Sequence, residues 1–98
     1  MVGRPDMKNE AARALRGSIL RACLQMYPRP TMFSTLRWIT DTFGADDEDI
    51  EKEIAYLEGR QWLKTRPIEI IGRKDTRVEL TSDGVDVARG IDPKAPII

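Results

Sequence analysis

The segment that most limits the possible folds is residues 46–57, whose apolar side chains recur at helical spacing. Ile50, Ile54 and Leu57 stand at positions i, i+4 and i+7, which places them in one stripe along a helix. Asp46 precedes the stripe and can cap the first turn, where the helix dipole favours negative charge. We therefore expect a helix from Asp46 to about Gly59 or Gln61 that packs one face on a core.

Two further helices are expected before this one. A helix over residues 9–27 ends at two prolines, and the chain then continues as an extended link. A second helix runs from Met32 or Ser34 to Phe43, and a short glycine-containing turn joins it to the helix at 46, as in a helix-turn-helix. Gly17, inside the first helix, is expected to permit close packing of a neighbour. The apolar stripe of the first helix consists of Ala12, Leu15, Ile19, Ala22, Cys23 and Met26.

The pattern changes after Gln61. β-Branched runs at 67–71 and 76–80, separated by turn residues 72–75, predict a β-hairpin. Residues 81–84 (Thr-Ser-Asp-Gly) can cap a short helix over 83–89, which Gly90 stops. The sequence therefore predicts an α+β fold of the winged helix-turn-helix type: three helices, a two-stranded hairpin wing and a short closing helix. A flexible N-terminal arm (1–8), the winged-helix domain (9–90) and an extended C-terminal tail (91–98) are the expected parts.

Two local motifs carry a resemblance to known proteins. Residues 57–63 (Leu-Glu-Gly-Arg-Gln-Trp-Leu) and residues 80–84 (Leu-Thr-Ser-Asp-Gly) follow each other in the order seen in winged-helix regulators. Residues 50–58 (Ile-Glu-Lys-Glu-Ile-Ala-Tyr-Leu-Glu) carry a closer resemblance. In length and layout the chain resembles the small winged-helix proteins of Mu-like phages and prophages. The resemblance implies a DNA-binding fold and a phage or prophage context, in which transcription regulation is the expected role.

The composition argues against several kinds of chemistry. The 98 residues include no histidine and one cysteine, and the seven glycines are scattered singly. A Ser-His-Asp site, a thiolate metal site and a glycine-rich nucleotide loop are therefore not expected. Cys23 lies in the apolar stripe of the first helix and is interpreted as a small core residue. We expect a protein that is not an enzyme, holds no metal or cofactor, spans no membrane and is cytoplasmic, since no signal-peptide pattern begins the sequence.

The charge is balanced overall but unevenly distributed. The 16 basic and 16 acidic residues give a net charge of zero. Residues 1–37 hold seven bases and two acids, residues 38–58 one base and eight acids, and residues 59–81 six bases and three acids. Two basic segments thus flank an acidic one, and the basic segments are the candidates for contact with a polyanion.

The expected wing provides the candidate nucleic-acid contacts. Arginine and lysine at a wing commonly reach phosphate or the minor groove, although wing tips are also often charged simply because they are solvated. Two arginines of the first helix are further candidates. The full set is Arg73, Lys74 and Arg77 at or near the tip, Arg66 and Lys64 leading into it, and Arg13 and Arg16 on the first helix.

The third helix has the opposite charge to that of a DNA-reading helix. From Asp46 to Glu58 there are seven acids and one base. These acids can be capping groups and a solvated face, or they can dock a basic partner protein through Glu48, Glu51 and Glu58. Trp38 falls off the apolar stripe of the second helix and is either covered by another part of the chain or offered to the partner.

Two hypotheses follow from these charges. The first is DNA binding led by the wing, and the alternative is a protein-interaction module that uses the acidic third helix. A homodimer is compatible with either, formed through the first helix or through the closing helix and its isoleucine-rich tail.

Overall fold

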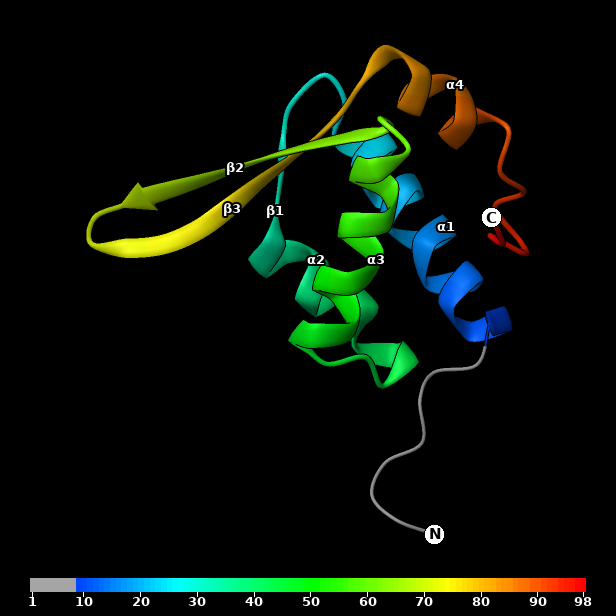
Figure 1. Cartoon of the computed structure of the whole chain (residues 1–98), viewed down its shortest axis with the longest axis horizontal. Coiled ribbons are helices and arrows are strands. Elements are labelled where there is room, and N and C mark those ends of the chain that lie inside the picture. The colour runs from blue at the N-terminus through cyan, green and yellow to red at the C-terminus, as the bar shows by residue number, and fades with distance from the viewer. Residues whose placement is uncertain (1–8) are drawn as a thin grey trace, which may run out of the picture.

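The computed structural model describes residues 9–98 and shows an α+β fold, as expected from the sequence. Within these residues there are four α-helices, one short 3-10 helix and one three-stranded antiparallel sheet (Figure 1). The expected arm, residues 1–8, lies outside the described residues. The elements are α1 (Asn9–Met26), β1 (Thr31–Met32), α2 (Phe33–Ile39), η1 (Thr40–Phe43), α3 (Asp47–Gly59), β2 (Leu63–Ile70), β3 (Arg73–Leu80) and α4 (Ser82–Arg89).

The hydrophobic core lies where α1 meets α2, α3, α4 and the base of the sheet. The stripe predicted on α3 is confirmed, because Ile50, Ile54 and Leu57 are all buried. Burying a side chain of this size contributes about 1.5–3 kcal/mol, so the stripe alone holds α3 firmly in place. Cys23 is also buried in this core, as predicted. The other core residues include Leu15, Ile19, Leu20, Leu36, Leu63, Val78 and Ala88.

The N-terminal ends of α3 and α4 are capped by the side chains of the residues that precede them. Asp46 is the N-cap of α3, and its side chain accepts a hydrogen bond from the backbone N–H of Asp49, whose carboxylate accepts one from the N–H of Asp46. Thr81 caps α4 by accepting from the N–H of Gly84 at 3.0 Å. The single helix expected up to Phe43 is instead α2 followed by η1, since the hydroxyl of Thr40 donates to the carbonyl of Leu36 at 2.7 Å and the last turn tightens.

The sheet has the strand order β1-β3-β2. β1 follows the prolines, where the sequence predicts an extended link, and its two residues pair with β3, Thr31 opposite Val78 and Met32 opposite Arg77. β2 pairs with β3 along its whole length, from Leu63 opposite Leu80 to Ile70 opposite Arg73. β2 is therefore an edge strand, and it contains Pro67, which has no N–H.

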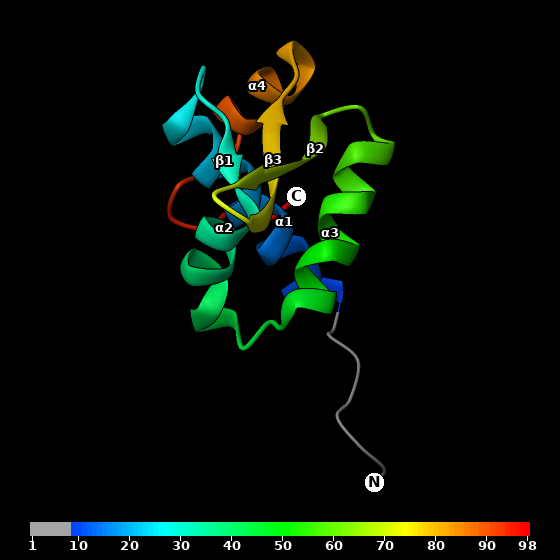
Figure 2. The same cartoon turned by 90° about the vertical axis from the view of Figure 1, so that its left-hand side faces the viewer.

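The β2–β3 hairpin is longer, and its turn shorter, than the sequence suggested. The expected loop 72–75 is wrong, because Arg73, Lys74 and Asp75 belong to β3 and the turn consists of Ile71 and Gly72. Both turn residues have positive φ, 50° and 75°, as in a type I′ hairpin turn. The pairing continues through charged residues because the outer hairpin projects beyond the helices and has no apolar core to follow (Figures 1 and 2).

The C-terminal residues pack back on α1. A Cβ built on Gly17 would collide with the carbonyl oxygen of Pro96, so the close packing expected at this glycine is confirmed. The backbone N–H of Ile98 donates to the carbonyl of Arg13 at 3.2 Å, and Ile91 is buried. Ile91 thus belongs to the core and is not available as the dimer surface that the sequence suggested.

A candidate binding surface formed by the hairpin and helix α3

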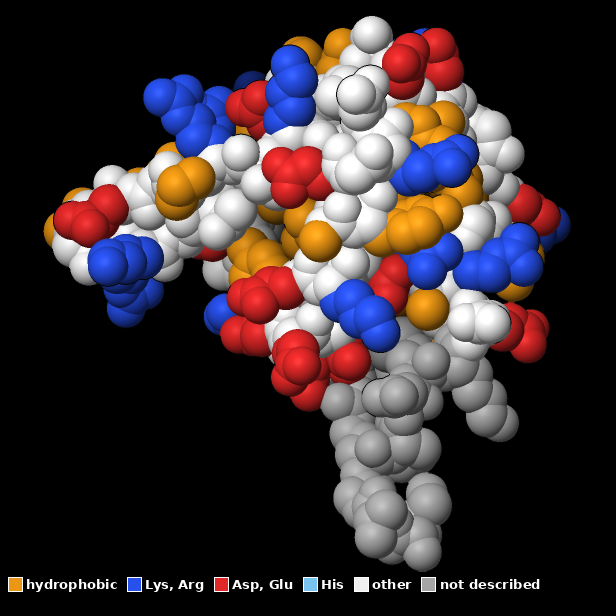
Figure 3. Space-filling model, viewed as in Figure 1, with side chains coloured by type: hydrophobic (Ala, Val, Ile, Leu, Met, Phe, Trp, Pro, Cys, Tyr) orange, Lys and Arg blue, Asp and Glu red, His pale blue; other side chains and the backbone are white. Residues whose placement is uncertain are grey.

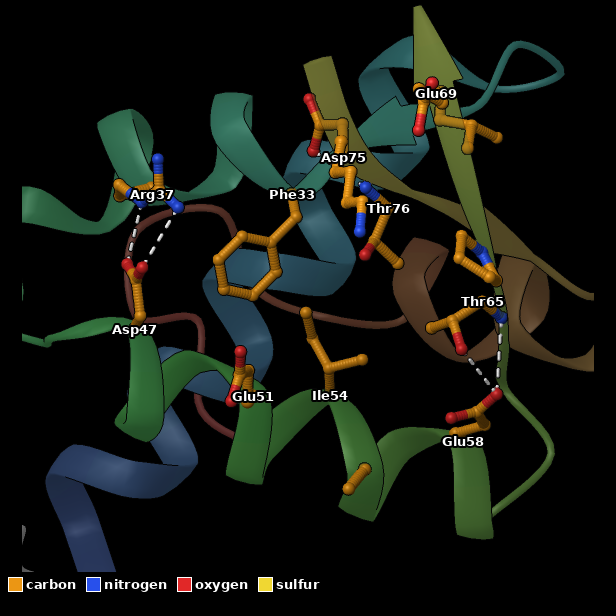
Figure 4. A pocket seen from close by; sticks show the side chains of 14 residues that line it. Phe33, Arg37, Asp47, Glu51, Ile54, Glu58, Thr65, Glu69, Asp75 and Thr76 are labelled. Carbon is orange, nitrogen blue, oxygen red and sulfur yellow. Dashed lines mark hydrogen bonds and ion pairs between the residues drawn. The ribbon is translucent and has the colours of Figure 1, made fainter. Parts of the chain in front are cut away.

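A groove lies between α3 and the hairpin, and the start of α2 closes one end of it (Figure 4). Its volume is about 770 Å³. The lining side chains come from α2 (Phe33, Arg37), α3 (Asp47, Glu51, Ile54, Ala55, Glu58), β2 (Thr65, Pro67, Ile68, Glu69) and β3 (Lys74, Asp75, Thr76).

The middle of the groove is apolar. The ring of Phe33 and the side chain of Ile54 face one another across it (Figure 4), and Pro67 of the hairpin is also part of the lining. Ala55 and Ile68 add to this apolar lining. A side chain entering the groove would therefore leave water and contact carbon atoms, which favours an aliphatic or aromatic group.

The rim of the groove is acidic. Five carboxylates line it, against the two bases Arg37 and Lys74; the carboxylates are those of Asp47, Glu51, Glu58, Glu69 and Asp75. Arg37 is already occupied, since its Nε and Nη2 donate to the two carboxylate oxygens of Asp47 at 2.7 and 3.0 Å. That ion pair raises the pKa of Arg37 above its usual value. The groove as a whole therefore favours a cationic ligand.

Two of the rim carboxylates also hold the groove in shape. The carboxylate of Glu58 accepts from the hydroxyl of Thr65 at 2.8 Å and joins α3 to β2 (Figure 4). Asp75 accepts from the hydroxyl of Ser34 at 2.6 Å, and this hydrogen bond lowers the pKa of the Asp75 carboxyl. Both sides of the groove are thus fixed relative to each other before any ligand arrives.

The predicted wing bases separate into two groups. Residues opposite one another in an antiparallel pair point to the same face, and that face alternates along each strand. Leu63, Thr65 and Val78 share one face, and the intervening residues form the opposite, outer face, which near the tip also contributes Ile68 and Asp75 to the groove lining. The outer face carries the bases Lys64, Arg66, Arg73 and Arg77 and the acids Asp75 and Glu79.

Lys74 belongs instead to the groove side, directly opposite Glu69. On the outer face Arg66 stands opposite Arg77, a pair of like charges that is unfavourable by itself. Arg77 forms an ion pair with Glu79 at 2.9 Å, and Glu79 also stands directly opposite Lys64. The outer face therefore holds four bases against two acids, and basic and acidic side chains lie next to each other at the tip of the hairpin (Figure 3).

The two candidate arginines of α1 are engaged within the chain. Arg16 pairs with the buried carboxylate of Glu53 on α3, and its guanidinium stacks 3.8 Å from the centre of the Tyr56 ring. Arg13 donates through Nε to the carbonyl of Ile98 at 3.3 Å. The structure therefore does not join Arg13 and Arg16 to the basic face of the hairpin.

The candidate partner-binding residues are partly brought together. Glu51 and Glu58 line the groove, while Glu48 is exposed on α3 outside it. Trp38 is 82% exposed, so the interpretation that another part of the chain covers it is wrong for the described residues. Sequence reasoning missed Phe33, which begins α2 and packs against the core only because β1 turns the chain at that point.

The tip of the hairpin is another feature that sequence reasoning missed. Ile71 is 97% exposed and Ile70 is 55% exposed, with Arg73 following directly in β3. The sequence signal was present, because an isoleucine immediately before glycine between two strands occupies a turn position that normally holds asparagine or aspartate.

Other kinds of site are not indicated by the part of the chain that is described. In residues 9–98 no three acidic or cysteine side chains converge as metal ligands, and no helix is long and apolar enough to cross a bilayer. Burial raises the pKa of the Cys23 thiol to about 11, which leaves it a poor nucleophile. No family model matches the chain, and no curated protein or solved structure shows significant similarity to it.

Proposed function

We propose that this chain is a winged-helix domain without enzymatic activity that binds duplex DNA through the outer face of its hairpin. The order of the helices and the antiparallel sheet are compatible with the winged-helix layout. The observation that carries the proposal is the strand register, which gathers Lys64, Arg66, Arg73 and Arg77 on one face of the hairpin, whose outer part projects away from the helices (Figure 1). The resemblance to Mu-like phage proteins favours a role in phage transcription regulation.

Helix α3 is not the DNA-reading element in this proposal. Its first turn presents Asp47, Glu48 and Asp49, and the groove beside it is rimmed by acids. Placing these carboxylates in a major groove would bring like charges together without releasing counterions. Contacts from the hairpin go to phosphates, which position a protein on DNA without specifying a sequence.

The number of available bases limits the strength of this binding. Four basic side chains can neutralise at most about four phosphates, so the logarithm of the binding constant should fall with the logarithm of salt concentration with a slope of about −3 to −4. Dissociation constants in the range of about 10⁻⁴ to 10⁻⁶ M are typical of such contacts at physiological salt.

Fluorescence anisotropy of a labelled duplex, titrated at several salt concentrations, tests the proposal. The double variant Arg66→Ala/Arg77→Ala should lose at least about tenfold in affinity and about two units of salt slope. The matched control is Arg89→Ala/Lys94→Ala, which removes the same charge beyond the hairpin, at the end of α4 and after it, and should bind more strongly than the hairpin variant. Absence of binding at low salt, or equal losses in the two double variants, would reject the proposal.

A second candidate function is binding of a protein segment by the groove. Its acidic rim and apolar middle favour a segment in which lysine or arginine alternates with aliphatic residues. A labelled synthetic peptide of alternating lysine and leucine should bind the wild-type chain and bind Glu51→Lys several-fold more weakly. An unchanged affinity in that variant would count against this function.

A further inference from the structure

The tip of the hairpin combines exposed apolar side chains with an unfavourable backbone. Ile71, at φ 50° and 97% exposed, is a β-branched residue in the left-handed region, where asparagine or glycine is normally found. It contributes nothing to the core of its own chain. An unfavourable backbone conformation at an exposed isoleucine suggests that its side chain makes a contact outside the chain.

The groove offers a surface complementary to that tip. The turn places Ile70 and Ile71 next to Arg73 and Lys74, and with Glu69 opposite Lys74 the tip is apolar and carries a net positive charge. The groove is apolar in the middle and acidic at the rim, with more carboxylates than bases among its lining residues. Each chain therefore carries both halves of a complementary pair.

We propose that the occupant of the groove is the hairpin tip of a second copy of this chain, in a reciprocal two-fold dimer. This proposal rests on the second candidate function, protein binding by the groove, and names the partner. The groove-side faces of the two hairpins stack on each other, with opposite directions. Ile71 of each copy packs near Phe33 and Ile54 of the other, and Arg73 and Lys74 approach the carboxylates of the opposite α3.

The dimensions and the symmetry suit this arrangement. Each strand of the hairpin has eight residues, which is about 26 Å at 3.3 Å per residue, long enough to reach from one hairpin base to the other copy's helix. Because each copy donates a tip and accepts one, the assembly closes at two copies and does not grow into a filament. In this arrangement Arg73 takes part in the dimer, while Lys64, Arg66 and Arg77, which lie nearer the hairpin base, remain for the proposed DNA contacts.

Sedimentation velocity over a wide range of protein concentration tests the dimer. The wild-type chain should dimerise with rising concentration, and more weakly as salt is added. Ile71→Asn should weaken the dimer at least about tenfold while keeping or raising the melting temperature, because asparagine suits the turn. Loss of the dimer in this variant would therefore not be a folding defect.

Two charge-reversed variants sharpen the assignment. Arg73→Glu/Lys74→Glu reverses the tip, and Glu51→Lys/Ala55→Lys reverses the groove; each should be monomeric alone. An equimolar mixture should form a heterodimer. The acidic tip of the first variant then meets the basic groove of the second, and the native tip of the second meets the native groove of the first. Asp86→Lys on α4 is the control and should dimerise like the wild type.

Three results would overturn the proposal. They are a wild-type chain that stays monomeric at every concentration, a dimer that all the tip and groove variants leave intact, and a charge-reversed mixture that stays monomeric. If a monomeric wild-type chain still bound the lysine-leucine peptide, self-association would be rejected while the groove's more general protein-binding function would stand.

Discussion

Ile71 shows how a single residue can oppose the local conformation that its neighbours require. Positive φ at two successive residues is what a two-residue hairpin turn demands, and Gly72 meets that demand without strain. An isoleucine in the left-handed region costs roughly 1–2 kcal/mol. Full exposure of its side chain brings no compensating burial. The turn is therefore less stable than its length and position allow.

Replacing Ile71 with asparagine should stabilise the fold. The free energy of unfolding should rise by about 1 kcal/mol, because asparagine tolerates positive φ and the exposed isoleucine contributes no packing. Urea unfolding followed by circular dichroism at low protein concentration would measure the change. Gly72→Ala is the matched opposite case and should destabilise, since it adds a Cβ where φ is 75°. A lower stability of Ile71→Asn would show that the isoleucine makes contacts within the chain.

Cys23 links the stability of the fold to alkaline pH. Burial raises the pKa of its thiol from 9.0 to about 11 in the folded chain. Between these values the unfolded chain releases the proton and the folded chain retains it, so stability is present below pH 9 and falls as pH rises towards 11. The loss attributable to this thiol should reach about 2 kcal/mol. The check is to measure the free energy of unfolding of the wild-type chain and of Cys23→Ala across this pH range. It should fall less steeply with pH in Cys23→Ala.

At the level of whole elements, helices were more predictable from the sequence than strands. The period of Ile50, Ile54 and Leu57 and the cap at Asp46 are local signals, and the structure bears both out. The sequence predicts the hairpin at the right place but with strands that are too short, because charged residues such as Arg73 and Lys74 continue the pairing without any apolar alternation.

Pairing between distant segments left no local signal. β1 consists of two residues that become a strand only because β3, more than 40 positions later, supplies their hydrogen-bond partners. The exposure of Trp38 likewise depends on which elements happen to cover α2. The groove combines α2, α3 and both long strands, so its acids were visible in the sequence but its apolar middle was not.

The pair of Arg16 and Glu53 should be a principal link between α1 and α3. Their side chains are 20% and 6% exposed. Glu53→Ala removes the buried partner and should lower the free energy of unfolding by about 2 kcal/mol, since hydrogen bonds to charged groups contribute about 1.5–3 kcal/mol. A double-mutant cycle with Arg16→Ala measures the coupling. Additive losses would mean that the two side chains act independently, contrary to this expectation.

For the molecule as a whole, zero net charge hides a separation of charge in space. Acids gather along α3, while the hairpin carries more bases than acids (Figure 3). Such a distribution orients the protein on approach to a polyanion and allows two surfaces to act separately. The proposed DNA contact uses one surface, and the proposed self-association joins the tip to the other.

The packing of the C-terminal residues on α1 can be tested through Gly17. In an isolated helix, Gly17→Ala would stabilise by about 1 kcal/mol. In the whole chain the added Cβ would meet the carbonyl of Pro96, so the substitution should destabilise. Deleting residues 93–98 removes that contact, so Gly17→Ala should then stabilise the chain. Thermal unfolding of the wild-type chain, the substitution, the deletion and their combination measures the change. The same sign in both backgrounds would show that the tail contact is weak.

The edge position of β2 has a consequence for how the protein behaves when concentrated. An exposed edge strand offers unpaired backbone groups to any other strand, and the run of isoleucines near the tip would make such pairing attractive. Pro67 interrupts that row of donors in the middle of the strand. The missing donor therefore opposes pairing of this edge with a strand of another molecule, and with it amyloid-like fibril growth at high concentration.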